Sequence, residues 1–327
     1  MATMPPQSQP WPGDRAVLFV HGIGDAKPGD YAPLMQQVQS ILGDGANKVA
    51  FYFLYYDQID EWFANKVQAS KQFALLVNAI RSRIAASGPS SASLGNVIAE
   101  FAGDVIWPVL IPDARLSVRA ALLQQLEQIV LDGQAANVKP RDQHVSIICH
   151  SMGCFHVYEA LQVAAADPGS GLSPATWGFS FDNVIFMASP VMLIQSAVRA
   201  IRSAIPQPET IACGSGPLVA PSQPGEQGQP VPMVKRIVSI TGNMDPVGGY
   251  LVRKQLPWAY MNLPGQIPFV DNEQVIQVDG SDDLSLTALL QDAIRDGGSP
   301  KITPENPHDW SAYIGRHADD LRSWLLG

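Results

Sequence analysis

Charged side chains are scarce in this chain, where Asp, Glu, Lys and Arg make up 16% of 327 residues. The net charge is −9, and this argues against nucleic acid as a partner because nucleic-acid-binding domains are basic. No apolar run reaches the ~18 residues of a membrane span, so no transmembrane segment is expected.

Cysteine is also rare, with only Cys149, Cys154 and Cys213. Three cysteines do not suggest a disulfide framework, and they lack the suitably spaced partners of a zinc site, so no metal site is expected. The first residues, Met1 to Pro10, lack the basic and apolar regions of a signal peptide. The expected location is therefore cytoplasmic.

Apolar residues make up 46% of the chain, which is long enough to bury a large core. One domain is expected over residues 15–327, after a flexible N-terminal segment over residues 1–14. Apolar, β-branched runs alternate with stretches of helical spacing, and this predicts an α/β fold with a mostly parallel sheet flanked by helices. The expected strands cover residues 15–20, 48–56, 144–149, 183–188, 234–240 and 274–278.

Two inserts interrupt this alternation. The stretch from Asp57 to Asp142 is longer than one crossover helix needs, and its excess, about residues 85–115, predicts a helical insertion. Such helices either cover the mouth of the site as a lid or extend the core. The second insert, about residues 206–232, is dense in Pro, Gly, Gln and Ser and predicts an irregular, mobile loop. This loop, or a helix at Val191–Ser203, is expected to rim the pocket.

A serine between small residues follows the strand expected at 144–149. The sequence there is Cys-His-Ser-Met-Gly, close to the nucleophile-elbow pattern Gly-x-Ser-x-Gly. In such an elbow the chain turns sharply from strand to helix, exposes the serine hydroxyl and frees the next N–H for an oxyanion. The pattern predicts Ser151 as nucleophile and the Met152 N–H as an oxyanion donor. A buried strand followed by a serine helix cap is the alternative.

A glycine-rich turn, His-Gly-Ile-Gly at residues 21–24, follows the first expected strand. Glycines let the backbone approach a substrate oxygen, so the Ile23 N–H is predicted as the second oxyanion donor. The alternative is the dinucleotide fingerprint of a dehydrogenase. That fingerprint requires Gly or Ala where this chain has Lys27, and an acidic residue about 20 positions later that is missing here.

A nucleophilic serine needs a base, and an acid that orients the base. Asp245 lies in a Gly-Asn-Met-Asp-Pro turn after the strand expected at 234–240, where open parallel sheets gather functional groups. Asp279, after the strand expected at 274–278, is the reserve candidate. An ordinary Asp-Pro turn is the alternative interpretation of Asp245.

Two of the six histidines are candidates for the base, because the other four belong to the oxyanion turn or lie near the serine and its strand. His308 lies in a proline-punctuated loop before the expected C-terminal helix, which can carry it to the carboxyl edge of the sheet. His317 falls on an apolar stripe with helical spacing, which favours a position in the core. That stripe consists of Trp310, Tyr313, Ile314, His317, Leu321 and Trp324.

From about Arg15 onward the chain resembles the α/β-hydrolase superfamily. The resemblance rests on residues 21–24, 150–153 and 243–247 and on His308 with Tyr313 downstream. Residues 101–105, together with the Asp-Pro-Val turn, are similar to serine-esterase and lipase-like members. The resemblance implies an α/β-hydrolase fold with Ser151 as nucleophile, His308 as general base and acid, and Asp245 as the group that fixes the imidazole tautomer.

The expected reaction is hydrolysis of a carboxylic ester through an acyl-enzyme, without metal or organic cofactor. Gly22, Gly24, Val247 and Trp310 are expected to line the substrate site, which suits the apolar chain of a small ester or lipid. Thioesterase, amidase or acyltransferase activity would use the same triad. A hydrolase-fold protein that binds a ligand without turnover is the alternative from another class. The oligomeric state stays open.

Overall fold

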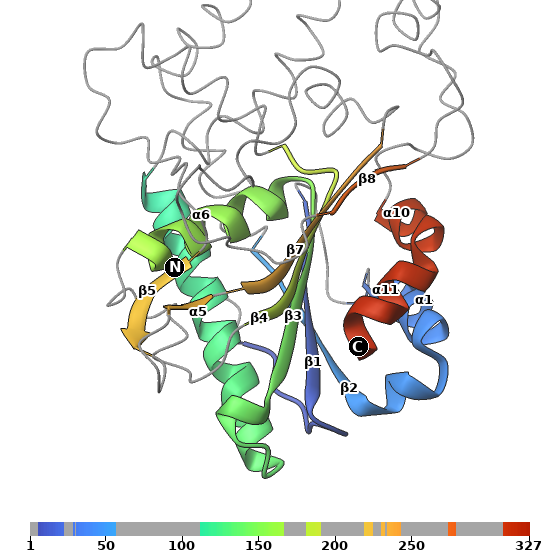
Figure 1. The fold of residues 1–327 in the computed structure, drawn as a ribbon, viewed down its shortest axis with the longest axis horizontal. Coiled ribbons are helices and arrows are strands. Elements are labelled where there is room, and N and C mark those ends of the chain that lie inside the picture. Colours follow the sequence, from blue (N-terminus) through green and yellow to red (C-terminus); the bar gives the residue numbers. More distant parts are fainter. Residues whose placement is uncertain are drawn as a thin grey trace, which may run out of the picture.

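A parallel sheet of six strands forms the centre of the protein (Figure 1). The fold is known from a computed structural model, which describes residues 6–22, 29, 31–56, 112–166, 181–190, 219–224, 230–232, 234–242, 274–278 and 310–327. The strands are β1 (Arg15–Val20), β2 (Val49–Leu54), β3 (His144–His150), β4 (Phe181–Met187), β7 (Val234–Gly242) and β8 (Gln274–Val278). Their order across the sheet is β2-β1-β3-β4-β7-β8.

The strands form where the sequence predicted them, with ends that shift by one or two residues. Both faces of the sheet are covered by helices, so β1, β2 and β3 are buried along almost their whole length. This explains why they read as continuous apolar runs instead of alternating ones. The prediction of an α/β fold with a parallel sheet is confirmed.

Helices lie on both faces of the sheet (Figure 1). On one face lie α1 (Ala32–Leu42), α10 (Trp310–Arg316) and α11 (Ala318–Leu326), and on the other lie α5 (Pro112–Ala135) and α6 (Met152–Ala166). Two short 3₁₀ helices, at Gly43–Lys48 and Pro140–Asp142, lead into β2 and β3. Within the described ranges, every helix is too short or too polar to span a lipid bilayer.

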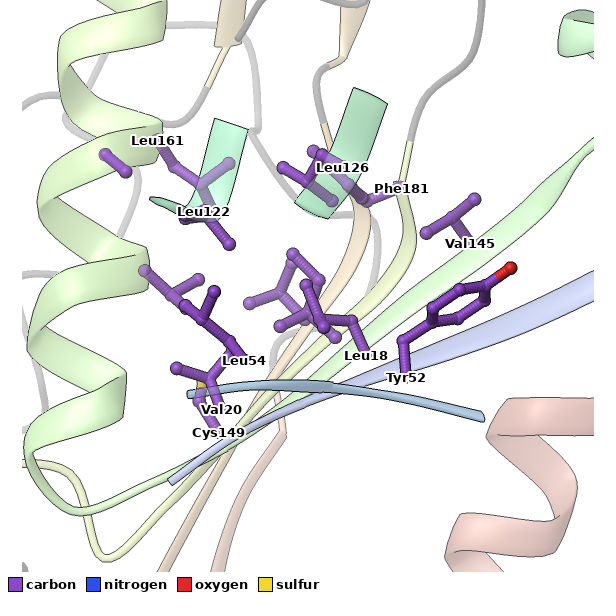
Figure 2. Close-up of a cluster of buried hydrophobic side chains, with 14 of the residues drawn as sticks. Leu18, Val20, Tyr52, Leu54, Leu122, Leu126, Val145, Cys149, Leu161 and Phe181 are labelled. Atoms are coloured by element: carbon purple, nitrogen blue, oxygen red, sulfur yellow. The ribbon is translucent and has the colours of Figure 1, made fainter. Parts of the chain in front are cut away.

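The core on the α5 and α6 face is mainly aliphatic. Figure 2 shows side chains of β1 to β4 meeting side chains of the two helices. Leu18, Val145 and Leu161 are each at most 1% exposed. The labelled members of this cluster are Leu18, Val20, Tyr52, Leu54, Leu122, Leu126, Val145, Cys149, Leu161 and Phe181.

The core on the opposite face combines aliphatic side chains with a cluster of aromatic rings. Phe19 of β1 stacks on Phe53 of β2, with ring centroids 5.1 Å apart, and meets the edge of Trp310 at 5.9 Å. The six residues of the C-terminal stripe are all buried, as their spacing predicted. They belong to two helices instead of one, because the chain leaves the α-helical conformation at His317, where φ is −112° and ψ is 31°.

The two C-terminal helices run antiparallel to the strands. At the carboxyl edge of the sheet, Trp310 stacks on His150, the last residue of β3. At the amino edge, the guanidinium of Arg15, the first residue of β1, donates to the carbonyl of Leu325 at 3.1 Å. The start of α10 is therefore held close to the end of β3.

Residues 6–14 form an N-terminal arm that lies against β2 and α5. The side-chain amide of Gln9 donates to a carbonyl of β2, and the Gln7 side chain accepts from the N–H of Phe53 at 2.8 Å. The carboxylate of Asp132, on α5, accepts from the Gln9 N–H at 2.9 Å. This part of the segment expected to be flexible is therefore packed on the domain.

A second difference concerns the loop expected at about residues 206–232. Strands β5 (Val219–Pro224) and β6 (Pro230–Pro232) pair here as a small antiparallel sheet. Proline lacks an N–H and is confined to edge positions of sheets, and a two-stranded ribbon has only edges. A high proline content is therefore compatible with the two paired strands found here.

Residues 85–111 of the expected helical insertion lie outside the described residues, whereas residues 112–115 belong to α5.

Candidate active site

Ser151 makes the turn between β3 and α6 on its own. Strand β3 ends at His150 and helix α6 begins at Met152. The φ of Ser151 is 51°, in the left-handed region that costs an ordinary L residue about 1–2 kcal/mol. Its N–H donates to the carbonyl of Met187 at 3.0 Å, which ties the turn to β4. Strand, strained turn and helix thus follow one another as the elbow motif requires.

The glycines near Ser151 allow backbone to pack directly against it. A Cβ placed on Gly22 would lie 2.6 Å from the Cβ and 3.2 Å from the Oγ of Ser151. A Cβ on Gly153 would lie 2.2 Å from the carbonyl oxygen of His21. Only glycine fits at either position. The turn after β1 and the elbow at Ser151, which are separate motifs in the sequence, therefore contact each other directly.

Two buried thiols support the elbow from the side of β4. Cys149 Sγ lies 3.3 Å from the carbonyl of Ile185, and Cys154 Sγ lies 3.4 Å from that of Met187. Burial raises the pKa of the Cys149 thiol well above its usual value, and the neighbouring Cys154 raises it further. Cys149 is therefore held as a neutral thiol that fills a small space, and this suits packing better than nucleophilic attack.

The site lies where the order of the strands reverses. From β1 the chain goes on to β2 on one side, whereas β3, β4, β7 and β8 follow one another on the other side. In open parallel sheets, ligands bind outside the carboxyl ends of the strands at such a switch point. Ser151 follows β3, and Gly22 follows β1, at this point.

An aromatic side chain packs against the turn that follows β1. The ring of Tyr56, two residues beyond the end of β2, stacks on the ring of His21 with centroids 4.2 Å apart. Its hydroxyl donates to the carbonyl of His21 and lies 3.3 Å from that of Gly22. The Nδ1 of His21 also contacts the Gly22 carbonyl. Because a carbonyl only accepts, this nitrogen carries the ring proton.

The two histidines of this region are kept neutral. Burial lowers the pKa of His21 to about 4, with the bond to the Gly22 carbonyl acting in the opposite direction. Burial lowers the pKa of His156, on α6, to about 3, and the positive charges of His21 and Arg115 add to this effect. The His156 ring meets Tyr56 at a centroid distance of 5.0 Å. Neither imidazole carries a charge at neutral pH.

A buried ion pair joins α5 to α6 nearby. Arg119 lies 3.6 Å from the carboxylate of Glu159. Burial raises the pKa of Glu159, and the positive charges of Arg119 and Arg115 oppose that rise. The pair holds α6, the helix that begins at the elbow, against its neighbour.

Trp310 lies beneath the elbow. Its ring stacks on His150 with centroids 5.4 Å apart and an angle of 14° between the planes. It is buried within the aromatic core, so it supports the residue next to Ser151. His317, the reserve base, is buried at the break between α10 and α11, where its Nδ1 lies 3.3 Å from a carboxylate oxygen of Asp320.

The other predicted site residues lie outside the described residues. These are Ile23, Gly24, Asp245, Val247, Asp279 and His308. The structure thus brings together Ser151, Met152 and Gly22, and the rest of the site stays a prediction. Across the described ranges, no three His, Cys, Asp or Glu side chains gather closely enough to hold a metal ion.

Sequence reasoning missed Tyr56 and set His156 aside as a neighbour of the serine. A usable signal exists for Tyr56, because it falls at the end of the strand expected at 48–56. The carboxyl ends of adjacent parallel strands meet at one edge, so this residue lies near the turn after β1 once β2 is known to be the neighbour of β1. Only the fold reveals that β2 is the neighbour of β1.

Comparison with known proteins adds little to this geometry. No family model and no curated protein matches the chain. One similar structure is a crystal structure of an uncharacterized protein from Pseudomonas aeruginosa, with 14% identity and a TM-score of 0.27. The match covers 70% of this chain and 35% of that protein, so this chain spans about a third of its length.

Proposed function

We propose that the protein is a serine hydrolase of the α/β-hydrolase fold that cleaves carboxylic esters. The observation that carries this proposal is the strained φ of 51° at Ser151, with the backbone of Gly22 packed against its side chain. A protein keeps such strain where the surrounding structure enforces it, and strained residues cluster at active sites. A serine that merely caps a helix has an extended backbone, not a left-handed one.

The oxyanion site in this proposal combines two backbone donors. Met152 is the first residue of α6, and the first N–H groups of a helix have no partner within the helix. The second donor is the N–H of Ile23, which follows Gly22 in the chain. Donors arranged before the reaction stabilise the charge that develops on the substrate oxygen.

The base in this proposal is His308, and the position of Trp310 supports it. They are two positions apart in the chain, so their Cα atoms lie at most about 7 Å apart. Trp310 in turn stacks on His150, next to Ser151. His317 follows Trp310 by seven residues on helices that lead toward the amino edge, which makes it the poorer candidate.

The acid in this proposal is Asp245. It comes three residues after Gly242, the last residue of β7, and β7 is two strands from β3. Adjacent strands are about 4.8 Å apart, so the end of β7 lies about 10 Å from that of β3, which a histidine side chain between them can bridge. Asp279 follows β8, one strand further away.

The reaction then proceeds through an acyl-enzyme. The Oγ of Ser151 attacks the ester carbonyl carbon while its proton passes to His308, and the tetrahedral oxyanion forms against the two N–H groups. Collapse breaks the ester bond, and the departing alcohol takes the proton from His308. Water repeats the same steps and releases the acid and Ser151. Thioesters and amides would react in the same way.

The test is hydrolysis of p-nitrophenyl esters from acetate to palmitate, with a fluorophosphonate label located by mass spectrometry. We expect activity and labelling in the wild type, both lost in Ser151→Ala. Ser146→Ala is the matched control, because Ser146 is also buried in β3 and lies five residues before the elbow. A folded wild type that neither turns over these esters nor takes the label would overturn the proposal and favour a ligand-binding protein.

A further inference from the structure

We propose that Tyr56 is a positioning residue for catalysis, which holds the peptide after Gly22 so that its N–H faces the oxyanion. This inference rests on the proposed function, because it concerns the same reaction. It adds a residue from a third strand to a site otherwise built on the ends of β1 and β3.

The turn after β1 is held by several contacts that converge on two carbonyls. Tyr56 is 1% exposed, so its hydroxyl has no access to water and must find its partner in the protein. Its partners are the carbonyls of His21 and Gly22. The Nδ1–H of His21 converges on the same Gly22 carbonyl. The phenol has one proton, so the Tyr56 hydroxyl holds the carbonyl of His21 and contacts that of Gly22, while the Nδ1–H of His21 holds the Gly22 carbonyl.

A carbonyl that is held in place also fixes the orientation of the peptide group to which it belongs. In a planar trans peptide, the C=O and the N–H point in opposite directions. The contacts that hold the Gly22 carbonyl therefore restrict the direction open to the N–H of the same peptide. Hydrogen bonds to a carbonyl also polarise the N–H of its amide. Tyr56 thus acts on this donor through its contact with the Gly22 carbonyl and through the His21 ring on which it stacks.

Tyr56 is itself held rigidly. Its ring lies between the ring of His21 and the edge of His156, at 4.2 Å and 5.0 Å. His156 is on α6, the helix that begins at the elbow. Tyr56 therefore contacts both the turn after β1 and the helix after Ser151, and it fixes the distance between the two halves of the oxyanion site.

The decisive variant is Tyr56→Phe, which keeps the ring and removes only the hydroxyl. Loss of a direct oxyanion donor costs about 10²–10³ in kcat. Tyr56 acts through such a donor, so we expect a smaller loss of about 10-fold in kcat with KM changed less than about twofold. The Ki of an alkyl trifluoromethyl ketone, which forms a tetrahedral adduct with the serine, should rise by the same factor because it also needs the oxyanion site.

Tyr52→Phe is the matched control. Tyr52 lies in β2, is fully buried, and its hydroxyl donates to Asp132 at 2.8 Å. Removing either hydroxyl should lower the urea concentration at the midpoint of unfolding by a similar amount. Only Tyr56→Phe should change kcat and the Ki of the ketone, so a purely structural role predicts equal behaviour of the two variants.

The outcomes separate this inference from the proposed function. If the wild type is inactive and unlabelled, the proposed function fails. If the wild type depends on Ser151 but Tyr56→Phe keeps its kcat and Ki, or changes KM alone, only the role of Tyr56 is overturned.

A second pair of variants applies if Tyr56→Phe does not fold. His21→Ala removes the Nδ1–H that holds the Gly22 carbonyl, whereas His21→Asn places an amide N–H near the position of Nδ1–H. Lower kcat in the alanine variant, with recovery in the asparagine variant, would support a held carbonyl. Equal kcat in both would contradict it.

Discussion

At the carboxyl edge of the sheet, the residues that directly follow β3 and β4, Ser151 and Ala188, have φ values of 51° and 54°. Toward the amino edge, strands of the same sheet are joined to their surroundings by ordinary contacts. Asn183 of β4 donates to the carbonyl of Trp324 at 2.8 Å, and Arg15 of β1 donates to that of Leu325 at 3.1 Å. One edge of the sheet holds strained backbone, and the other holds satisfied polar groups.

The difference shows how one set of strands can serve two requirements. Strain at the carboxyl edge is tolerated because the amino edge and the two cores supply the free energy that maintains it. Changes at the carboxyl edge should therefore affect activity more than stability. Changes at the amino edge should do the reverse.

The strongest test of this contrast is Ser151→Gly beside Ser151→Ala. Both remove the proposed nucleophile, and we expect both to lower kcat by about 10⁴-fold or more. Glycine adopts a positive φ without strain, so Ser151→Gly should unfold with about 1 kcal/mol more free energy than Ser151→Ala in urea titrations. Equal stabilities would show that the elbow stores no strain.

The next largest effect is expected for Gly22→Ala. The added Cβ would lie 2.6 Å from the Cβ of Ser151, so the turn after β1 must move away from the elbow. We expect kcat to fall by about 10²–10³, the range for loss of one oxyanion donor. Gly43→Ala is the control, because that glycine has open space around it, although its φ of 57° makes the change costly to stability. Retained activity in Gly22→Ala would contradict the contact.

Acidification should weaken the carboxyl edge through its neutral histidines. The folded pKa of His21 is about 4 and that of His156 about 3, below the usual 6.5, so unfolding takes up protons at acid pH. Their contribution to stability is complete above pH 6.5 and is lost as the pH falls toward these values, by an amount on the order of a few kcal/mol.

The free energy of unfolding, measured by urea titration between about pH 7 and about pH 4.5, tests this expectation. His156→Leu removes one of the two groups, so that only His21 is left to take up a proton on unfolding. This variant should lose less stability on acidification than the wild type. An identical loss in both would show that His156 accepts a proton without cost.

The smallest effect on activity is expected at the amino edge. Asn183 is buried, and its side chain donates to Trp324 and to Ser146 Oγ at 2.9 Å. Asn183→Ala should lower the free energy of unfolding by about 2–3 kcal/mol and leave kcat within about twofold. Asp182→Ala, which removes contacts to His144 and to the exposed Lys235, should cost about 0–1 kcal/mol. If Asn183→Ala lost most of its kcat but little of its free energy of unfolding, the proposed contrast between the two edges of the sheet would be wrong.

The parts of the fold that the sequence predicted are those set by local physics. Strands buried on both faces require continuous apolar runs, and the elbow requires a small residue at Gly153, so both are visible in the chain. The contacts of Tyr56 and of the N-terminal arm were not predictable in this way. They depend on which strands become neighbours, and glutamine side chains such as Gln7 and Gln9 carry no local signal for a partner more than 40 residues away.

The N-terminal arm has a consequence for how molecules of this protein meet. Strand β2 is at the edge of the sheet, and an uncovered edge offers its N–H and C=O groups to any other chain. The Gln7 and Gln9 amides occupy two of those groups and so stand in for a neighbouring strand. Copies that lack residues 6–9 should therefore associate through β2 as their concentration rises, while their active sites remain intact.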